Sequence, residues 1–445
     1  MHHTLRLLAI PTFALSATAC GLFGIGGHEP SEGGDADAST TDAALDTSDG
    51  SDGYGDEQGG ADASASASAS AGDDDTGGGN HLPSAVATAI AAGRLHSCAV
   101  VQDGTVRCWG YEQVGQLGNG VIADMAHPEP VEVIGLDTAA VAIAAFGDHT
   151  CIVDDGGATW CWGDNADGQL GDGTGELSAT PRAVTGIPAA FAVAAGWAHT
   201  CIAATDGTAW CWGKNEYGQL GNGSTASALA PVQVAGLTGV QSIAAGRDHS
   251  CAATEDGTAW CWGGDVYGEL GDDADTDATQ VPVQVANLEG IIGVSAGGNA
   301  TCAWDDGGAA WCWGTNEYGQ LGDGNSGILL DSHYPVAVLG IDAGAAMIAT
   351  GWSFACGIVD GGARCWGSNY DGVLGTGEGP EVVSPTPVDV LGMGSGVAEI
   401  VTSSAHACAR TDAGAVRCWG TNGAGELGEG STSDATAPQP VISLP

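Results

Sequence analysis

One stretch constrains the fold more than any other, and it runs from Cys201 to Gly223. It recurs seven times with small changes, and its Trp-Gly step returns every 50 to 53 residues. A period near fifty residues indicates a repeat architecture, in which each unit needs neighbours to bury its apolar face. Each unit holds an apolar run, a turn, a second strand, a glycine-rich stretch and a Pro-Val strand, which predicts an all-β protein. The shared tryptophans are Trp109, Trp162, Trp212, Trp262, Trp313, Trp366 and Trp419.

The cysteines predict where each hairpin turns. Cys201 and Cys211 are ten residues apart, so a three-residue loop over 205–207 places them opposite each other. In the sixth repeat Cys356 and Cys365 are nine apart, and a two-residue turn restores the same opposition. Facing residues at a non-hydrogen-bonded site come close enough for a disulfide. Free thiols are the alternative, whereas a zinc site would need paired Cys-x-x-Cys spacing. The seven predicted bridges are Cys98–Cys108, Cys151–Cys161, Cys201–Cys211, Cys251–Cys261, Cys302–Cys312, Cys356–Cys365 and Cys408–Cys418.

The first nineteen residues are predicted to be a signal peptide. Arg6 precedes a short apolar run, and the small residues 17–19 lead to Cys20, which resembles a bacterial lipoprotein signal. Fifteen cysteines less seven pairs leave Cys20 unpaired, as a lipidated residue would be. An ordinary cleaved secretory signal is the alternative. Either signal places the mature chain outside the cytoplasm, where disulfides persist.

Residues 20–82 are predicted to be a disordered acidic linker, rich in Ser, Ala and Gly. No Lys or Arg occurs from Glu29 to Asp75, while Asp and Glu recur throughout. Low hydrophobicity combined with high net charge prevents a segment from burying enough surface to fold. We expect this linker to hold the globular region away from a membrane.

Residues 83–445 form the predicted globular region. Its repeated pattern is Gly-x-x-His-x-Cys, Asp-Gly, Cys-Trp-Gly-x-Asn-x-x-Gly-Gln-Leu-Gly-x-Gly and Pro-Val, most complete in 196–223 and 246–277. This pattern resembles the regulator of chromosome condensation repeat. The resemblance implies a seven-bladed β-propeller with one four-stranded blade per repeat. The first unit starts near Ala89 and the last ends near Leu444, so we expect the two ends to meet and close the ring.

The resemblance does not carry its family's function over directly. The eukaryotic namesake is a guanine-nucleotide exchange factor that binds chromatin, which requires a basic surface. This chain has nine Lys plus Arg against 55 Asp plus Glu, so its charge disfavours nucleic acid. An exported protein would not meet a cytoplasmic GTPase. A secreted bacterial β-lactamase inhibitor protein is similar in using this propeller to bind a protein outside the cell.

The sequence predicts no catalytic residues, no cofactor and no metal. Five repeats carry a His two residues before the first Cys, but Ala300 and Phe354 replace it in the fifth and sixth repeats. A position that accepts Ala and Phe favours a structural role. Neither a phosphate-binding loop nor a nucleophile elbow is present. The five histidines are His96, His149, His199, His249 and His406.

The loops before the Pro-Val strands vary most, and rigid scaffolds present binding residues on such loops. The fifth loop carries the candidate partner-binding residues; the fourth is acidic at Asp272, Asp273, Asp275 and Asp277; and the first contains Met125, His127 and Pro128. Apolar residues on the fifth loop either contact a partner or pack onto their own blade, and the sequence leaves both open. The five candidate residues are Ile328, Leu329, Leu330, His333 and Tyr334.

The sequence as a whole favours a lipoprotein of the bacterial cell envelope, in the outer membrane or at the cell surface. We expect it to bind an extracellular or periplasmic protein or glycan without catalysis, and to touch the membrane through its lipid anchor only. The alternatives are an envelope enzyme with a site in the propeller channel, a purely structural envelope component or, by family analogy alone, an exchange factor.

Overall fold

The computed structural model describes residues 86–274, 276–379 and 383–444. The predicted signal peptide, Cys20 and the linker to residue 82 lie outside the described residues. Within the described ranges, no helix is both long and apolar enough to cross a membrane.

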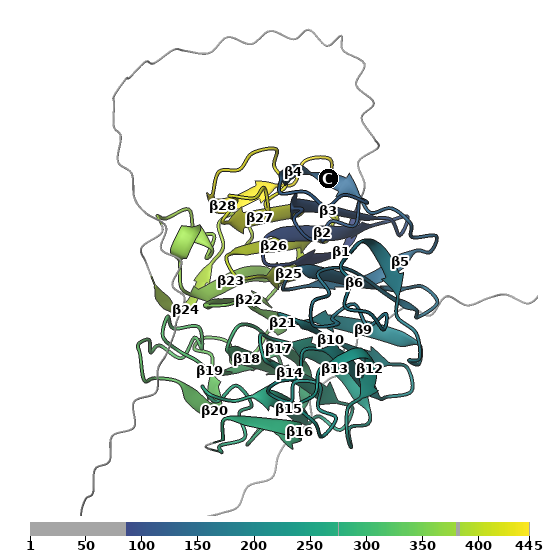
Figure 1. Ribbon diagram of the computed structural model, residues 1–445. Coiled ribbons are helices and arrows are strands. Elements are labelled where there is room, and N and C mark those ends of the chain that lie inside the picture. Colours follow the sequence, from purple (N-terminus) through teal and green to yellow (C-terminus); the bar gives the residue numbers. More distant parts are fainter. Residues whose placement is uncertain (1–85, 275, 380–382, 445) are drawn as a thin grey trace, which may run out of the picture. The chain divides into compact units, whose positions relative to one another are not determined.

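Seven four-stranded antiparallel sheets make up the described region, and each consists of four strands that are consecutive in the chain. Residues of all seven first strands line one central channel. In Figure 1 the fourth strands β16, β20, β24 and β28 lie at the rim, whereas β17, β21 and β25 lie near the middle. The predicted seven-bladed β-propeller is therefore confirmed. We number the blades 1 to 7 along the chain.

The blades follow the sequence repeats. The strands of blades 1 to 4 are β1 (Ala87–Ala92), β2 (His96–Val101), β3 (Val106–Tyr111), β4 (Ala126–Glu132), β5 (Ala140–Ala145), β6 (His149–Asp154), β7 (Thr159–Gly163), β8 (Ser178–Ala183), β9 (Ala190–Ala195), β10 (His199–Ala204), β11 (Ala209–Gly213), β12 (Ala228–Gln233), β13 (Val240–Ala245), β14 (His249–Thr254), β15 (Ala259–Gly264) and β16 (Ala278–Gln284).

Blades 5 to 7 repeat this arrangement, with one short 3-10 turn, η1 (Tyr370–Gly372), in blade 6. Their strands are β17 (Ile291–Ala296), β18 (Ala300–Asp305), β19 (Ala310–Gly314), β20 (Ser332–Ala337), β21 (Ala345–Thr350), β22 (Phe354–Val359), β23 (Gly362–Gly367), β24 (Ser384–Asp389), β25 (Val397–Thr402), β26 (His406–Thr411), β27 (Val416–Gly420) and β28 (Ala435–Pro440).

Each blade has the hairpin register that the cysteine spacing predicts. Cys201 of β10 lies opposite Cys211 of β11, and Gly207 closes the three-residue loop at φ +82°. In blade 6 the two-residue turn Asp360-Gly361 has positive φ at both positions and still aligns its cysteines. All seven predicted pairs are disulfide-bonded, with Cα atoms 4.0–4.1 Å apart.

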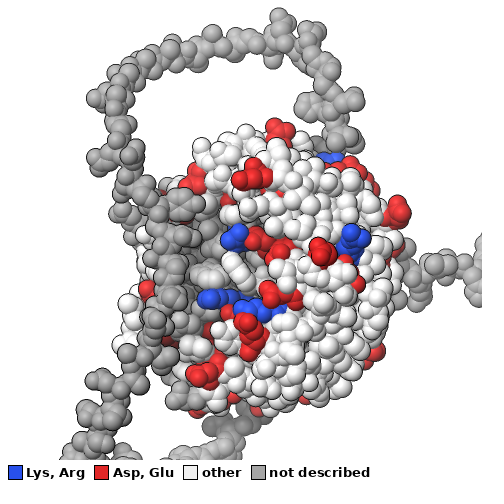
Figure 2. All heavy atoms as spheres, viewed as in Figure 1, with Lys and Arg blue, Asp and Glu red and all other residues white. Residues whose placement is uncertain are grey.

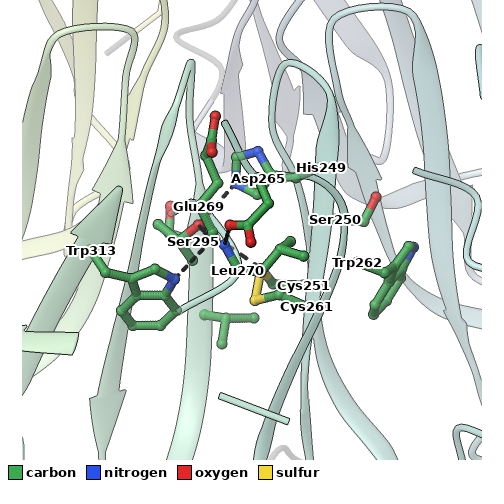
Figure 3. The surroundings of a disulfide bond; sticks show 12 residues. His249, Ser250, Cys251, Cys261, Trp262, Asp265, Glu269, Leu270, Ser295 and Trp313 are labelled. Carbon is green, nitrogen blue, oxygen red and sulfur yellow. Dashed lines mark hydrogen bonds between the residues drawn. A yellow bond between two sulfur atoms is a disulfide. The ribbon is translucent and has the colours of Figure 1, made fainter. Parts of the chain in front are cut away.

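The core lies between neighbouring blades, where all seven repeated tryptophans are fully buried. Each indole Nε1–H donates to a backbone carbonyl of the preceding blade, as from Trp313 to Glu269 at 2.8 Å. Figure 3 shows this bond beside the disulfide of Cys251 and Cys261. The glycine that follows the repeated Gln-Leu lies under the next indole: a Cβ on Gly171 would come within 2.7 Å of Trp212.

The ring closes where blade 7 meets blade 1. The backbone N–H of Ala87 donates to Gly414, and the indole of Trp109 donates to the carbonyl of Glu426 at 2.7 Å. No strand is exchanged there, because blades 1 and 7 each contain four strands of their own. The first and last blades therefore meet and close the ring as expected, through packing of two complete blades.

Candidate binding face

Two sets of loops leave the same end of every blade. In blade 5, Ala300 at the start of β18 pairs with Gly314 at the end of β19, which pairs with Ser332 at the start of β20. The loop before Ala300 and the long loop before Ser332 therefore lie at the same end. The same register holds in the other blades, so all seven variable loops share one side of the propeller with the Gly-x-x-His loops. We call this side the mouth face.

The repeated histidines lie buried beneath this face and join neighbouring blades. Each imidazole Nε2–H donates to a Ser or Thr hydroxyl of the next blade over 2.7–2.9 Å, and each hydroxyl donates to a backbone carbonyl. Burial lowers the pKa of all five histidines to about 3 or 4, so they are neutral at pH 7. The predicted structural role is confirmed. The pairs are His96–Thr150, His149–Thr200, His199–Ser250, His249–Thr301 and His406–Ser97.

A ring of hydrogen bonds surrounds the opening of the central channel. Each Gly-x-x-His loop bonds to the corresponding loop of the next blade, as from the N–H of Trp197 to the carbonyl of Gly246 at 3.1 Å. The ring closes where the Ser404 hydroxyl donates to the carbonyl of Arg94 at 3.3 Å. The residues at this position of the seven loops are Arg94, Gly147, Trp197, Arg247, Gly298, Trp352 and Ser404, so five of the seven carry a side chain.

Two tryptophans and two arginines of this ring pack together. The indoles of Trp197 and Trp352, from blades 3 and 6, meet edge to face with centroids 5.3 Å apart. The Arg94 guanidinium lies 5.6 Å from the Trp197 ring centre, and that of Arg247 lies 5.4 Å from the Trp352 ring centre. Such cation–π contacts hold planar groups at defined orientations. The four side chains narrow the mouth of the channel.

Charged side chains also lie around the opening of the channel. Of the eight Lys and Arg in residues 86–445, three lie here. Arg94 pairs with Asp148 at 3.0 Å, while Asp248 accepts both Arg247 at 3.2 Å and Lys214 at 3.3 Å. Burial raises the pKa of Asp148 despite Arg94. Burial alone would lower the pKa of Lys214, but Asp248 and Glu216 together raise it. Basic side chains on the face drawn in Figure 2 likewise lie beside acidic ones.

The fifth variable loop exposes its apolar residues. The side chains of Ile328, Leu329 and Leu330 are 77%, 89% and 47% exposed, and Tyr334 is 51% exposed. Leu329 has φ +78°, a left-handed conformation that a leucine rarely adopts. The sequence left open whether this loop packs onto its blade, and the structure places its tip in solvent. We call Ile328, Leu329 and Leu330 the apolar tip.

The fourth and fifth loops touch each other. His333 is half-buried; its Nδ1 lies 3.2 Å from the carbonyl of Ala274, and its own carbonyl accepts the N–H of Asp273. His333 is therefore a link between the loops, whereas Tyr334 lies beside it at the surface. Asp275 of the acidic loop lies outside the described residues. In the part of the chain that the structure describes, no group of three His, Cys, Asp or Glu side chains is placed to hold a metal ion.

Sequence reasoning missed the aromatic and basic cluster at the mouth. A pattern in the sequence could have indicated this cluster. The first variable position of the Gly-x-x-His loop is Arg, Gly and Trp in repeats 1 to 3, and the same order returns in repeats 4 to 6. Exposed tyrosines follow Cys-Trp-Gly in blades 3, 4 and 6, and they too escaped notice. They are Tyr217, Tyr267 and Tyr370.

Family comparisons agree with this architecture. A model described as "RCC1-like domain" matches residues 73–397, and one described as "Regulator of chromosome condensation (RCC1) repeat" matches residues 397–426. The ultraviolet-B receptor UVR8 of Arabidopsis thaliana is 32% identical over 367 residues, which cover 81% of this chain and 70% of that protein. The E3 ubiquitin-protein ligase HERC2 of Mus musculus and of Homo sapiens is 31% identical over 182 residues. That match covers 38% of this chain but only 4% of the ligase.

Solved structures resemble the chain in fold. Human WBSCR16 superimposes with a TM-score of 0.67 at 24% identity, covering 76% of this chain and 94% of that one. Prp20p of Saccharomyces cerevisiae superimposes with a TM-score of 0.66 at 20% identity, covering 81% and 87%. At these identities the likeness concerns the propeller alone.

Proposed function

Because the chain belongs to the family of RCC1-like domains, we propose that it is a non-catalytic scaffold whose mouth face binds a protein or glycan outside the cytoplasm. The observation that carries this proposal is the apolar tip, which holds three consecutive aliphatic side chains in solvent. Apolar area of this kind is stabilised only when another surface covers it. The tip lies on the face that also carries the Trp197–Trp352 pair and the exposed tyrosines, residue types that dominate protein interfaces.

The experiment is affinity capture from envelope extract with the full-length chain, followed by chemical crosslinking. Replacing Leu329→Ser and Leu330→Ser together should abolish retention of the partner while shifting the Tm by no more than a few degrees. The matched control replaces Val121→Ser and Ile122→Ser, an exposed apolar pair on the first loop of the same face. Equal retention by both variants would remove the apolar tip from the binding site.

The proposal includes tethering to a membrane through a lipid on Cys20. Seven disulfides support export, because such bonds persist in oxidising compartments. The fourteen bonded cysteines leave Cys20 as the odd one of fifteen. Cys20→Ser should move the protein from the membrane fraction to the soluble fraction. A variant that stays membrane-bound would contradict the lipid anchor while leaving partner binding intact.

A second candidate comes from the name of the Arabidopsis relative, which is an ultraviolet-B receptor. The observation that favours it is the contact of two indoles, the side chains that absorb at the longest ultraviolet wavelengths, at the channel mouth. Ultraviolet-B illumination should then change near-ultraviolet circular dichroism in the native chain but not in the Trp197→Phe/Trp352→Phe variant. Unchanged spectra in the native chain would exclude this candidate.

A further inference from the structure

The end of the propeller opposite the mouth face carries one tight turn from every blade. In blade 1, β2 starts at the mouth with His96 and ends at Val101, so the turn that leads to β3 lies at the opposite end. We call this end the base face. Each of its seven turns carries an exposed aspartate, and Glu255 adds a further carboxylate in blade 4. The seven aspartates are Asp103, Asp155, Asp206, Asp256, Asp306, Asp360 and Asp412.

Three of these carboxylates are held by the threonine two residues further along the chain. In each case the threonine hydroxyl donates to the carboxylate over 2.6–2.7 Å. Hydrogen bonds from threonine hydroxyls lower the pKa of all three aspartates, so they are fully ionised at pH 7. The pairs are Asp103–Thr105, Asp206–Thr208 and Asp256–Thr258.

Exposed apolar side chains lie around the channel on the same face. The first strand of every blade has a β-bulge at its second residue; in blade 2, Ala140 and Ala142 pair with β6 but Val141 does not. A bulge turns a side chain away from its regular direction. Val141, Phe191 and Ile292 hold this position in blades 2, 3 and 5, and they are 56%, 43% and 45% exposed. The other blades have Thr88, Gln241, Ala346 and Ala398. The two alanines also line the channel, so these seven positions surround its opening at the base face.

The acidic turns and the apolar residues lie side by side. The turn glycine of each blade accepts the N–H of the first residue of the next blade, as Gly257 does from Ile291 at 2.9 Å. Asp256 precedes that glycine and Ile292 follows that isoleucine, so a carboxylate and an exposed aliphatic side chain flank one hydrogen bond. Equivalent bonds join Gly104 to Ala140, next to Val141, and Gly157 to Ala190, next to Phe191.

No basic side chain offsets these carboxylates at the base of blades 2 to 5. These blades contain three Lys and Arg in all. Lys214 and Arg247 pair with Asp248 at the mouth, and Arg182 of the outer strand β8 bonds to Ser178. Blades 1, 6 and 7 differ, because each has an arginine in the strand that follows the turn. Uncompensated negative charge and exposed apolar side chains therefore coincide at the base of blades 2 to 5.

We propose that the base of blades 2 to 5 binds a lysine- or arginine-rich segment of another protein that carries an aliphatic or aromatic anchor. The anchor packs on Val141, Phe191 and Ile292, and the basic side chains of the segment face the surrounding aspartates. Charge complementarity selects this partner, since the same carboxylates repel nucleic acid, an anionic membrane and a second copy of this acidic chain. The base face lies at the opposite end from the apolar tip and does not depend on the mouth-face partner.

The test is fluorescence anisotropy of the full-length chain with a labelled Lys-Gly repeat peptide that has a Leu-Phe pair at its centre. We expect saturable binding that weakens as salt is added. The same peptide with Ala-Ala at its centre should bind about tenfold more weakly, because it buries less apolar area. Non-specific attraction between charges is equal for both peptides, so the ratio of their affinities reports the anchor. Equal affinities would overturn the proposal.

Two double variants locate the anchor. Phe191→Ser/Ile292→Ser should bring the ratio of affinities to about one, since both side chains are exposed parts of the patch. The matched control is Leu329→Ser/Leu330→Ser, which removes two exposed aliphatic side chains from the mouth face and should keep the ratio. An unchanged ratio in folded Phe191→Ser/Ile292→Ser, or a ratio lost in the control, would place the peptide elsewhere and overturn the base-face site.

A second pair of variants locates the charges. Asp206→Asn/Asp256→Asn should weaken both peptides about tenfold. The control Glu176→Gln/Glu317→Gln removes two exposed carboxylates from the mouth face and should change little. Equal losses in the two variants would mean attraction to the acidic protein as a whole and would overturn the assignment. This pair decides the matter if Phe191→Ser/Ile292→Ser does not fold, and it leaves capture of the mouth-face partner unaffected.

Discussion

Five of the seven blade interfaces are joined by a buried His and a hydroxyl, whereas the interfaces between blades 5 and 6 and between blades 6 and 7 are not. At the former, His199 of blade 3 bonds Ser250 of blade 4. At the blade 5–6 interface both positions are alanine, Ala300 and Ala355, and at the blade 6–7 interface they are Phe354 and Ala407. Where the His is missing, the hydroxyl is missing too.

This difference shows that the polar pair behaves as a unit. Removing one member leaves a buried donor or acceptor without a partner, while replacing both by apolar groups can be almost neutral. At the blade 6–7 interface both polar residues are replaced by apolar ones, and Phe354 is fully buried in a cluster with Met393, Val373 and Trp419. Apolar packing there replaces the hydrogen bond.

The largest expected effect comes from breaking the apolar interface. Phe354→Ala leaves a cavity between blades 6 and 7 and should lower the free energy of unfolding by about 3–5 kcal/mol. Urea unfolding followed by tryptophan fluorescence measures it. The control is Phe191→Ala, which truncates an exposed phenylalanine of β9 and should change little. A loss no larger than the control would show that Phe354 does not carry this interface.

The next effect comes from breaking one polar pair. The Ser250 hydroxyl accepts from His199 and donates to the carbonyl of Gln219, both at 2.9 Å. Ser250→Ala should cost about 1–3 kcal/mol, because His199 keeps a buried N–H without an acceptor. A double-mutant cycle with His199→Ala should give a coupling of about 0.5–3 kcal/mol. Additive single effects would contradict the view that the two residues act as a unit.

The pH dependence of the free energy of unfolding also distinguishes the interfaces that contain a buried His from those that do not. The pKa of His199 falls to about 3, mainly through burial and to a smaller extent through His249, His149 and Lys214. The unfolded chain therefore takes up the proton first as pH drops below about 6.5. Its contribution to stability is complete above that pH and is lost as pH falls toward 3. In this pH window, each buried His should lower the free energy of unfolding by up to about 1.4 kcal/mol for every pH unit that the pH falls.

Buried carboxyl groups act in the opposite direction. Burial raises the pKa of Glu112 and Glu426 to about 7, so these groups favour the native state as pH falls from about 7 toward 4.5. The measurement is therefore the free energy of unfolding as a function of pH from 4.5 to 6.5. Its slope is compared between the native chain and the double variant His199→Ala/Ser250→Ala. The variant should lose stability less steeply, and equal slopes would show that His199 is not neutral when folded.

The last prediction concerns a single buried carboxyl group at one of the interfaces joined by a His and a hydroxyl. Burial raises the pKa of Glu269 to about 8, at a position where blades 1, 2, 3 and 5 have Gln. Its contribution to the free energy of unfolding is complete below about pH 4.5 and is lost as pH rises from there to about 8. Glu269→Gln should therefore match the native chain near pH 4 and exceed its free energy of unfolding by up to about 1.4 kcal/mol for each pH unit of this window. Exposed Glu317→Gln is the control, and an equal gain there would contradict the assignment.

Much of the propeller could be predicted from the sequence, because its determinants are local. The spacing of Cys356 and Cys365 alone predicted a two-residue turn, and the repeated Trp-Gly step predicted the interface core. The candidate site could be predicted only in part. The fifth loop was found from its apolar composition, but its exposure depends on whether the blade leaves a groove for it, which no local pattern encodes.

By itself, the sequence determined the number of blades, the hairpin registers and the seven disulfide pairs. A hairpin register depends on the count of residues between two strands, and that count can be read along the chain. Only the tertiary structure decided which residues meet at the channel mouth. Trp197 and Trp352 lie three blades apart in the chain, and ring closure alone brings their indoles together. The packing of neighbouring blades gives four of the five His their partners, about fifty positions along the chain, and ring closure brings His406 to Ser97.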